Sequence, residues 1–162
     1  MKQKTKKLLA FLTAVLLTVG CAGCGDKADD GNSANKGNGE NFIQKLAYQV
    51  FATQEDGKTV RVEITILSLD REYKLSEIMQ RAHEEHKLTY ESSAGMVTSI
   101  NGTANTADFS YCWMLYTTDA EMANSSWGTI TIGDQTLGSA IVGAEALEVL
   151  ENEMYVWEYT AF

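Results

Sequence analysis

The stretch Thr59-Val60-Arg61-Val62-Glu63-Ile64-Thr65-Ile66 decides the fold class, because its apolar and polar residues alternate strictly. Successive side chains of a strand point to opposite faces, so this pattern predicts a half-buried β-strand. The residues expected on its buried face are Val60, Val62, Ile64 and Ile66. Residues 46–51 (LAYQVF) predict a preceding strand, and the turn signal at 55–58 (EDGK) joins the two as a hairpin.

The hydrophobic period changes between Leu75 and His86, where a helix is expected. Its apolar face follows the i, i+3, i+4, i+7 spacing and comprises Leu75, Ile78, Met79 and Ala82, with His86 next along it. Ser76 is the expected N-cap, and Glu77 favours the positive end of the helix. Strand-like runs follow at 88–92, 96–101, 109–117, 128–132 and 154–162, whereas 138–150 has no clear period. A hairpin, one covering helix and several further strands predict an α+β domain with a β-grasp-like order and a mixed sheet.

The N-terminus has the composition of a bacterial signal peptide. Four lysines lie within the first seven residues, and an uncharged apolar run of twelve residues, 8–19, follows them. A helix needs about 20 apolar residues to cross the hydrocarbon core, so a permanent membrane span is not expected here. The sequence therefore predicts that the chain is exported.

The segment after the apolar run resembles the lipobox of bacterial lipoproteins. It reads Gly20-Cys21-Ala22-Gly23-Cys24-Gly25. In that family the signal is cut before a cysteine whose thiol carries a diacylglycerol. The resemblance implies a signal peptide over 1–23 and lipidation at Cys24, with Cys21 as the alternative, because it also follows a glycine. The lipid would anchor the protein in the bilayer, on the outer face of the bacterial cell membrane.

A flexible tether and one acidic domain are expected beyond the leader. Residues 24–41 comprise the candidate lipidated cysteine and a segment rich in Gly, Asn and Asp without large apolar residues, which cannot form a core. Residues 42–162 are long enough for one domain. Removing the leader's four lysines from the 13 basic residues leaves nine against 22 acidic ones, a formal charge of −13. Nucleic acid is therefore not an expected partner, because phosphate binding depends on clustered Lys and Arg.

Three segments resemble a known family. They are 97–102 (VTSING), 111–116 (YCWMLY) and 155–159 (YVWEY), and their order is similar to that of the transcobalamin-like C-terminal domain family, which includes stand-alone bacterial lipoproteins. The resemblance covers about 60–162 and implies a β-grasp fold and a surface for a small soluble ligand, of which a corrinoid is the specific case. Two departures are that Cys112 separates an often adjacent Tyr-Trp pair, and that the larger α-helical domain of transcobalamin is not found in this sequence.

Aromatic residues are the candidates for ligand binding. Alternation places Tyr111 and Trp113 on one strand face and Tyr116 on the other, while Tyr155, Trp157 and Tyr159 share a face of the last strand. Core packing accounts for many such rings, and the remainder could form a flat platform. The candidate ligand-binding residues are Tyr111, Trp113, Tyr116, Trp127, Trp157 and Tyr159. The alternative function is a surface-protein or cell-wall interaction module that presents a sheet edge or the Ser126-Trp127 loop.

The sequence offers no constellation typical of an enzyme. His83 and His86 lie at i and i+3 instead of the i, i+4 spacing of zincins, without a marked third ligand, so no metal site or cofactor is expected. Cys112 lies in an apolar run and is predicted to be a buried, inert thiol. The glutamates at 145, 148, 151 and 153 lack calcium-loop spacing and are expected to form a solvated acidic edge.

Overall fold

The alternating stretch around Ile64 forms β2 (Lys58–Ser68), and β1 (Ala47–Glu55) pairs with it as the predicted hairpin. Asp56 and Gly57 make the turn with φ of 49° and 78°, as a type I′ hairpin turn requires. The computed structural model describes residues 45–162. The predicted signal peptide, both candidate lipidation cysteines and the tether lie outside the described residues.

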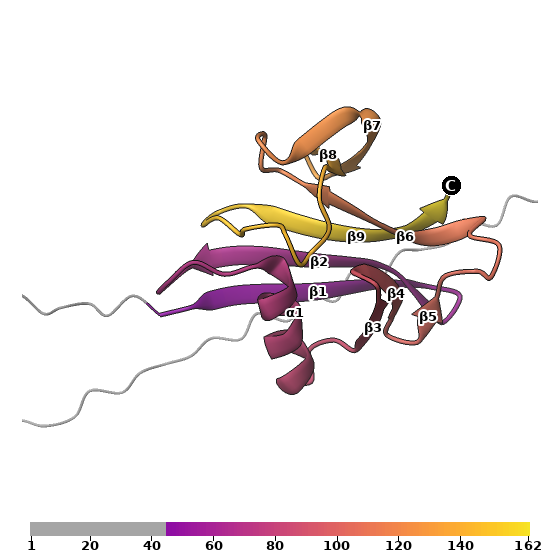
Figure 1. The fold of residues 1–162 in the computed structure, drawn as a ribbon, viewed down its shortest axis with the longest axis horizontal. Helices are drawn as coiled ribbons and strands as arrows, with labels where there is room; N and C mark the ends of the chain where they lie inside the picture. Colours follow the sequence, from indigo (N-terminus) through magenta and orange to yellow (C-terminus); the bar gives the residue numbers. More distant parts are fainter. Residues whose placement is uncertain (1–44) are drawn as a thin grey trace, which may run out of the picture. The chain divides into compact units, whose positions relative to one another are not determined.

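A six-stranded sheet is the main element of the domain (Figure 1). Its other strands are β6 (Tyr111–Thr117), β7 (Ala123–Ile132), β8 (Gln135–Ala140) and β9 (Met154–Ala161), and the spatial order is β1-β2-β9-β6-β8-β7. The expectation of a mixed sheet is wrong, because every strand pair in residues 45–162 is antiparallel. A parallel pair needs a crossover that returns to the same sheet. The helical connection after β2 leads into a different sheet instead.

That second sheet has three strands, β3 (Tyr90–Ser93), β4 (Met96–Ile100) and β5 (Thr103–Ala104), in the order β3-β4-β5. Its two turns are again type I′ in character: Ala94-Gly95 has φ of 52° and 80°, and Asn101-Gly102 has φ of 49° and 79°. The coarse α+β class is confirmed: the helix and this small sheet lie on the same side of the main sheet (Figure 1).

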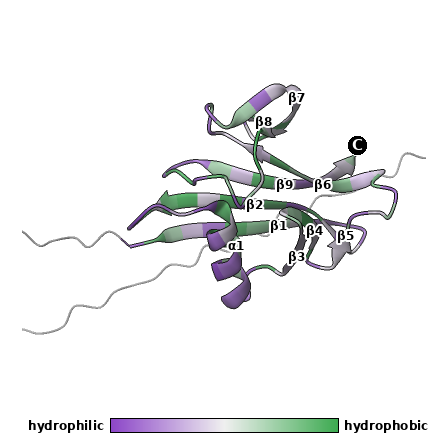
Figure 2. Cartoon of the chain, viewed as in Figure 1, coloured by the Kyte–Doolittle hydropathy of each residue, from purple (hydrophilic) through white to green (hydrophobic). Residues whose placement is uncertain are grey.

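The core lies between the main sheet and α1 (Leu75–Glu84). The predicted apolar face of the helix is buried, and it packs with Val62, Ile64 and Ile66 of β2. Figure 2 shows the corresponding contrast between the hydrophobic β2 and the hydrophilic outer side of α1. Val60 departs from the predicted alternation: the pairing register passes from Arg61 to Thr59, so Val60 has no opposite residue in β1 and lies in a bulge.

Both ends of α1 differ from the prediction. Ser76 is not the N-cap; Lys74 is, and the free N–H groups of Leu75 and Ser76 donate to the carbonyls of Leu147 and Ala144 at 2.9 and 3.0 Å. The helix ends two residues early in a Schellman motif, in which Lys87 N–H donates to Ala82 O at 2.8 Å.

His86 occupies the left-handed position of this motif with φ of 58°, so it lies outside the helical face to which its spacing assigned it.

The opposite face of the main sheet carries a second, smaller apolar cluster. The β7–β8 hairpin brings Leu137, Ile130 and Ile132 against Tyr116 and Val156. The predicted alternation within β6 and β9 is therefore confirmed, since their odd- and even-numbered residues pack into different clusters. Among the described residues, none of the helices has the length and apolar character needed to traverse a bilayer.

Candidate functional site

The six candidate aromatic residues do not lie on one surface. Trp113, Tyr116 and Trp157 are buried, Tyr159 is half-buried, and Tyr111 and Trp127 are exposed. Tyr116 lies on the face of the sheet opposite to Trp113 and Trp157, in the cluster below the β7–β8 hairpin. The structure therefore divides the predicted platform into separate environments.

Trp113 and Tyr159 attach β5 to the main sheet. Trp113 Nε1 donates to Thr103 O at 2.8 Å, and Tyr159 Oη donates to Ala104 O at 3.0 Å. Their ring centroids are 5.4 Å apart, and the ring of Tyr111 lies 5.8 Å from that of Tyr159. These hydrogen bonds satisfy the polar atoms of both rings. Trp113 and Tyr159 are accordingly structural, and only Tyr111 in this group presents a large exposed surface.

Trp127 lies within β7 and not in a free loop. In the β7–β8 pairing, Asn124 stands opposite Ser139 and Thr129 opposite Gly138. The four residues between Asn124 and Thr129 therefore have no partner in β8 and bulge out of the ladder. Within this bulge the side chain of Trp127 is 63% exposed. Trp127 is the most exposed of the six candidate residues, followed by Tyr111 at 49%.

An apolar cleft lies on the helix side of the main sheet. Its volume is about 390 Å³, and its walls are the β3–β4 turn and the segment 140–143 that follows β8. Leu115 of β6 and Trp157 of β9 also line it. The exposed apolar side chains on the two walls are Met96 and Ile141. Of the six candidate residues, Trp157 alone contributes to this cleft.

Two glycines let the walls approach closely. A Cβ atom on Gly143 would lie 3.3 Å from Gly95 O, tighter than most real contacts. Gly95 has φ of 80°, which glycine adopts without strain. Because residue 143 is a glycine, its backbone meets the carbonyl of Gly95 at a point where a side chain on residue 143 would force the two walls apart.

Trp157 carries an unsatisfied buried donor. The residue is 5% exposed, and its Nε1 has no hydrogen-bond partner in the described part of the chain. Buried polar groups in native proteins almost always have a partner, and an unpaired one costs about 1–3 kcal/mol. Nε1 itself is shielded from solvent, so no ligand acceptor reaches it in this conformation.

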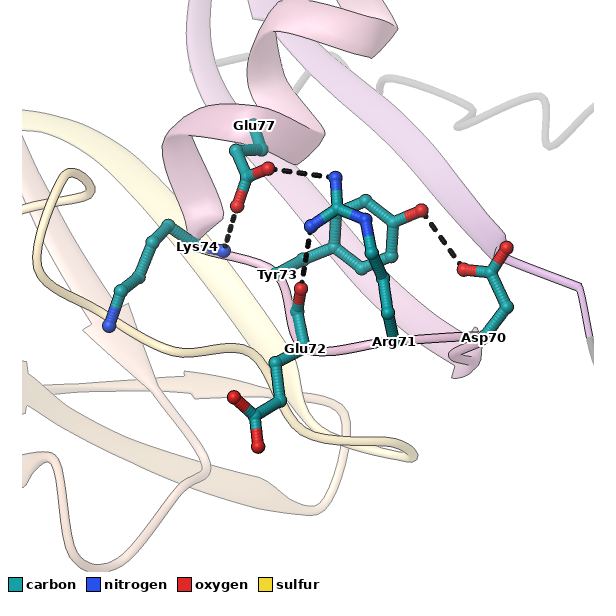
Figure 3. Close-up of polar contacts among 6 residues, drawn as sticks. All are labelled: Asp70, Arg71, Glu72, Tyr73, Lys74 and Glu77. Carbon is teal, nitrogen blue, oxygen red and sulfur yellow. Dashed lines mark hydrogen bonds and ion pairs between the residues drawn. The ribbon is translucent and has the colours of Figure 1, made fainter.

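A surface hollow of about 690 Å³ runs along the polar side of α1. Figure 3 shows the start of this region. Arg71 lies 3.7 Å over the ring of Tyr73 and binds Glu77 at 2.9 Å, while Tyr73 Oη donates to Asp70 at 2.9 Å. The N–H of Lys74 and the Arg71 guanidinium together lower the pKa of the Glu77 carboxyl. These charges satisfy one another and organise the entry into α1, so the hollow has few groups left for a ligand.

The residues weighed for catalysis or metal binding are apart from the cleft. His83 and His86 are exposed, and residues 45–162 contain no group of three His, Cys, Asp or Glu side chains placed to hold a metal ion. Cys112 is buried as predicted, and burial raises the pKa of its thiol.

The expected acidic edge has a structural role that its sequence did not predict. Glu148 binds Lys74 Nζ at 2.7 Å, Glu151 accepts the N–H of Leu69 at 2.7 Å, and Glu153 accepts a hydrogen bond from the hydroxyl of Thr118. These contacts attach the segment between β8 and β9 to three other parts of the domain. Most of these glutamates are exposed, as the prediction of a solvated edge requires. The prediction did not include their contacts with the rest of the domain.

Sequence reasoning missed the two walls of the cleft. The residues not anticipated there are Gly95, Met96, Ile141, Val142 and Gly143. A sequence feature could have indicated one of these walls. It is the run of small and apolar residues after β8, which has neither a helical nor a strand period.

Comparisons with protein-family models, with curated proteins and with solved structures find no match to this chain.

Proposed function

We propose that this protein is a membrane-tethered extracytoplasmic binding domain whose small, soluble ligand occupies the apolar cleft. The observation that carries the proposal is the cleft itself, with its apolar walls and with Trp157 in its lining, whose Nε1 has no hydrogen-bond partner among the described residues. Ligand sites are typically concave, mostly apolar and supplied with a few polar groups. The ligand class that fits is an apolar or planar molecule with a hydrogen-bond acceptor. A corrinoid is the planar ligand that the resemblance to the transcobalamin-like family suggests. Because a corrinoid is larger than the cleft, only an edge of the molecule would enter it.

Export, lipidation at Cys24 and attachment to the outer face of the cell membrane are part of the same proposal, and they rest on the N-terminal sequence. The proposed fold is a β-grasp-like variant. Support for it comes from the order of hairpin, helix and later strands, with β9 returning beside β2. We propose no catalytic role and no cofactor.

Calorimetric titration of the full chain with cobalamin and other corrinoids tests the ligand proposal. Ile141→Trp should fill the mouth of the cleft and abolish binding. Leu67→Trp is the matched control, because Leu67 is 46% exposed against 43% for Ile141 but lies in β2, away from the cleft. Trp157→Phe should weaken binding about tenfold, since a hydrogen bond contributes about 1–1.5 kcal/mol. Absence of heat at millimolar ligand, or equal binding by both tryptophan-filled variants, would exclude the cleft as a corrinoid site.

The second candidate is a surface-protein or cell-wall interaction module. Trp127 favours it, because a bulge holds this large ring exposed instead of packing it. Sedimentation of the protein with purified cell walls tests this candidate. Trp127→Ala should abolish co-sedimentation, whereas Ile141→Trp should leave it unchanged.

A further inference from the structure

The strand β1 is an open edge of the main sheet, at the end of the strand order where β2 is its neighbour (Figure 1). An edge strand presents a row of N–H and C=O groups that can pair with another chain. Proteins commonly protect such edges with proline, with charged residues, with bulges or by keeping the strand short. β1 has none of these devices before its last residue, Glu55: residues 46–54 (LAYQVFATQ) contain no proline, glycine or charged residue.

The pairing register shows that β1 is also regular. Two register shifts occur between β1 and β2, and both place the extra residue in β2, at Val60 and at Leu67. The nine residues of β1 are therefore continuous. The other described edges are interrupted or short: β7 contains the bulge at 125–128, β3 has four residues and β5 has two. β1 is the longest uninterrupted edge in residues 45–162.

The two faces of β1 differ in a way that leaves one large apolar side chain without cover. Tyr48, Val50 and Ala52 pack into the core. Phe51 lies on the opposite face and is 63% exposed. An exposed phenylalanine at the centre of an unprotected edge is typical of a surface that associates with a partner.

The charges beside this edge are self-complementary. Lys45 precedes β1 and Glu55 ends it, and both are exposed. If two copies pair antiparallel about Val50, residue numbers that sum to 100 stand opposite each other. Lys45 of each copy then faces Glu55 of the other. Phe51 faces Gln49 of the second copy, and the two Phe51 rings are diagonal neighbours, which at about 7–8 Å are within reach of each other.

We propose that β1 pairs antiparallel with the β1 strand of a second copy of this chain, centred on Val50. The pairing joins two six-stranded sheets into one continuous sheet through a two-fold, isologous interface. It involves neither the cleft nor Trp127, so it is independent of the proposed ligand. A single edge strand forms a small interface, and the dimer is therefore expected to depend on protein concentration.

Disulfide trapping of the full chain, expressed in a bacterial host and extracted in nonionic detergent, tests the register. Ala47→Cys with Thr53→Cys places a cysteine opposite a cysteine at two symmetric positions, leaves Phe51 in place, and should yield a covalent dimer on mild oxidation. Gln49→Cys with Thr53→Cys is the matched control on the same strand face, since residues 49 and 53 then stand opposite 51 and 47. Both variants retain the chain's other cysteines, so any background from these is equal. Failure to trap the first pair, or equal trapping of the control, would overturn the proposal.

Charge reversal provides a second test by analytical ultracentrifugation of the same preparation. Lys45→Glu should weaken dimerisation on the order of tenfold, because it creates two like-charge pairs per dimer. Adding Glu55→Lys in the same chain should restore it, since each pair is then complementary again. Phe51→Lys should give a monomer with an unchanged circular dichroism spectrum, because Phe51 is exposed. A double reversal that is as weak as Lys45→Glu alone, or a wild type that is monomeric at every concentration, would contradict the pairing.

Discussion

The buried hydroxyl of Tyr155 binds the segment that precedes β9. Its removal tests how much this one hydrogen bond stabilises the domain. Tyr155 is 0% exposed, and its Oη accepts the backbone N–H of Leu150 at 2.8 Å. Tyr155→Phe keeps the ring and leaves this N–H without its partner. A lost hydrogen bond costs about 0.5–1.5 kcal/mol, and a donor left unsatisfied about 1–3 kcal/mol. Because Leu150 lies near the surface, water can replace part of the bond, and we expect a loss of about 1 kcal/mol, or about 4 °C in Tm.

Urea titration followed by tryptophan fluorescence measures this change in the free energy of unfolding. Tyr116→Phe is the matched control: this tyrosine is also buried, on the adjacent strand β6, but its hydroxyl makes no hydrogen bond to the described residues. We expect the control to change stability by less than about 0.5 kcal/mol. If Tyr155→Phe costs no more than Tyr116→Phe, the bond to Leu150 does not stabilise the segment.

The stability difference between the wild type and Tyr155→Phe should also depend on pH. Burial raises the pKa of Tyr155 from 10.0 to about 12, so the folded chain retains the phenolic proton at a pH where the unfolded chain has lost it. The associated stability is fully present below pH 10 and is lost as the pH rises toward 12. The advantage of the wild type over Tyr155→Phe should therefore shrink across this interval. An advantage that stays constant or grows would refute the assignment.

Three further predictions concern other parts of the chain. Metabolic labelling with a fatty acid should mark the protein, and replacing Cys21 and Cys24 with serine should abolish the label; a labelled double variant would exclude lipidation at either residue. Gly138→Ala should destabilise the domain by about 1–3 kcal/mol, because its Cβ would lie 3.0 Å from that of Ala123 and 3.3 Å from the backbone nitrogens of Asn124 and Ser125. Adding Ala123→Gly should recover only part of the loss, since the two backbone contacts remain, as urea titration can check. In the variant that lacks Cys21 and Cys24, the thiol of Cys112 should react with a thiol reagent at least about tenfold more slowly in the folded chain than in urea. The reason is that this thiol is buried and its pKa is raised. Equal rates would show that the thiol is accessible in the folded chain.

Local patterns predicted the elements in which periodicity and turn chemistry act within a few residues. The hairpin of β1 and β2 followed from alternation and the Asp56-Gly57 turn, and the buried face of α1 followed from its 3.6-residue period. β8 escaped prediction because Gly138, Ser139 and Ala140 carry little hydrophobic contrast, although the strand is held by pairing with both β6 and β7. Its burial depends on neighbours that are distant in sequence.

The sequence by itself determined the coarse α+β class, the two faces of β6 and β9, and the burial of Cys112, because alternation fixes which side chains share a face. Tertiary structure alone decided where α1 begins, since the carbonyls that bond its first N–H groups belong to Ala144 and Leu147, about 70 residues away. It also decided which aromatic residue meets a cleft. Trp113 and Trp157 share a sheet face and a similar local sequence, yet Trp113 Nε1 finds the Thr103 carbonyl while Trp157 Nε1 finds none. That difference arises from packing between segments far apart in the chain, which no local pattern encodes.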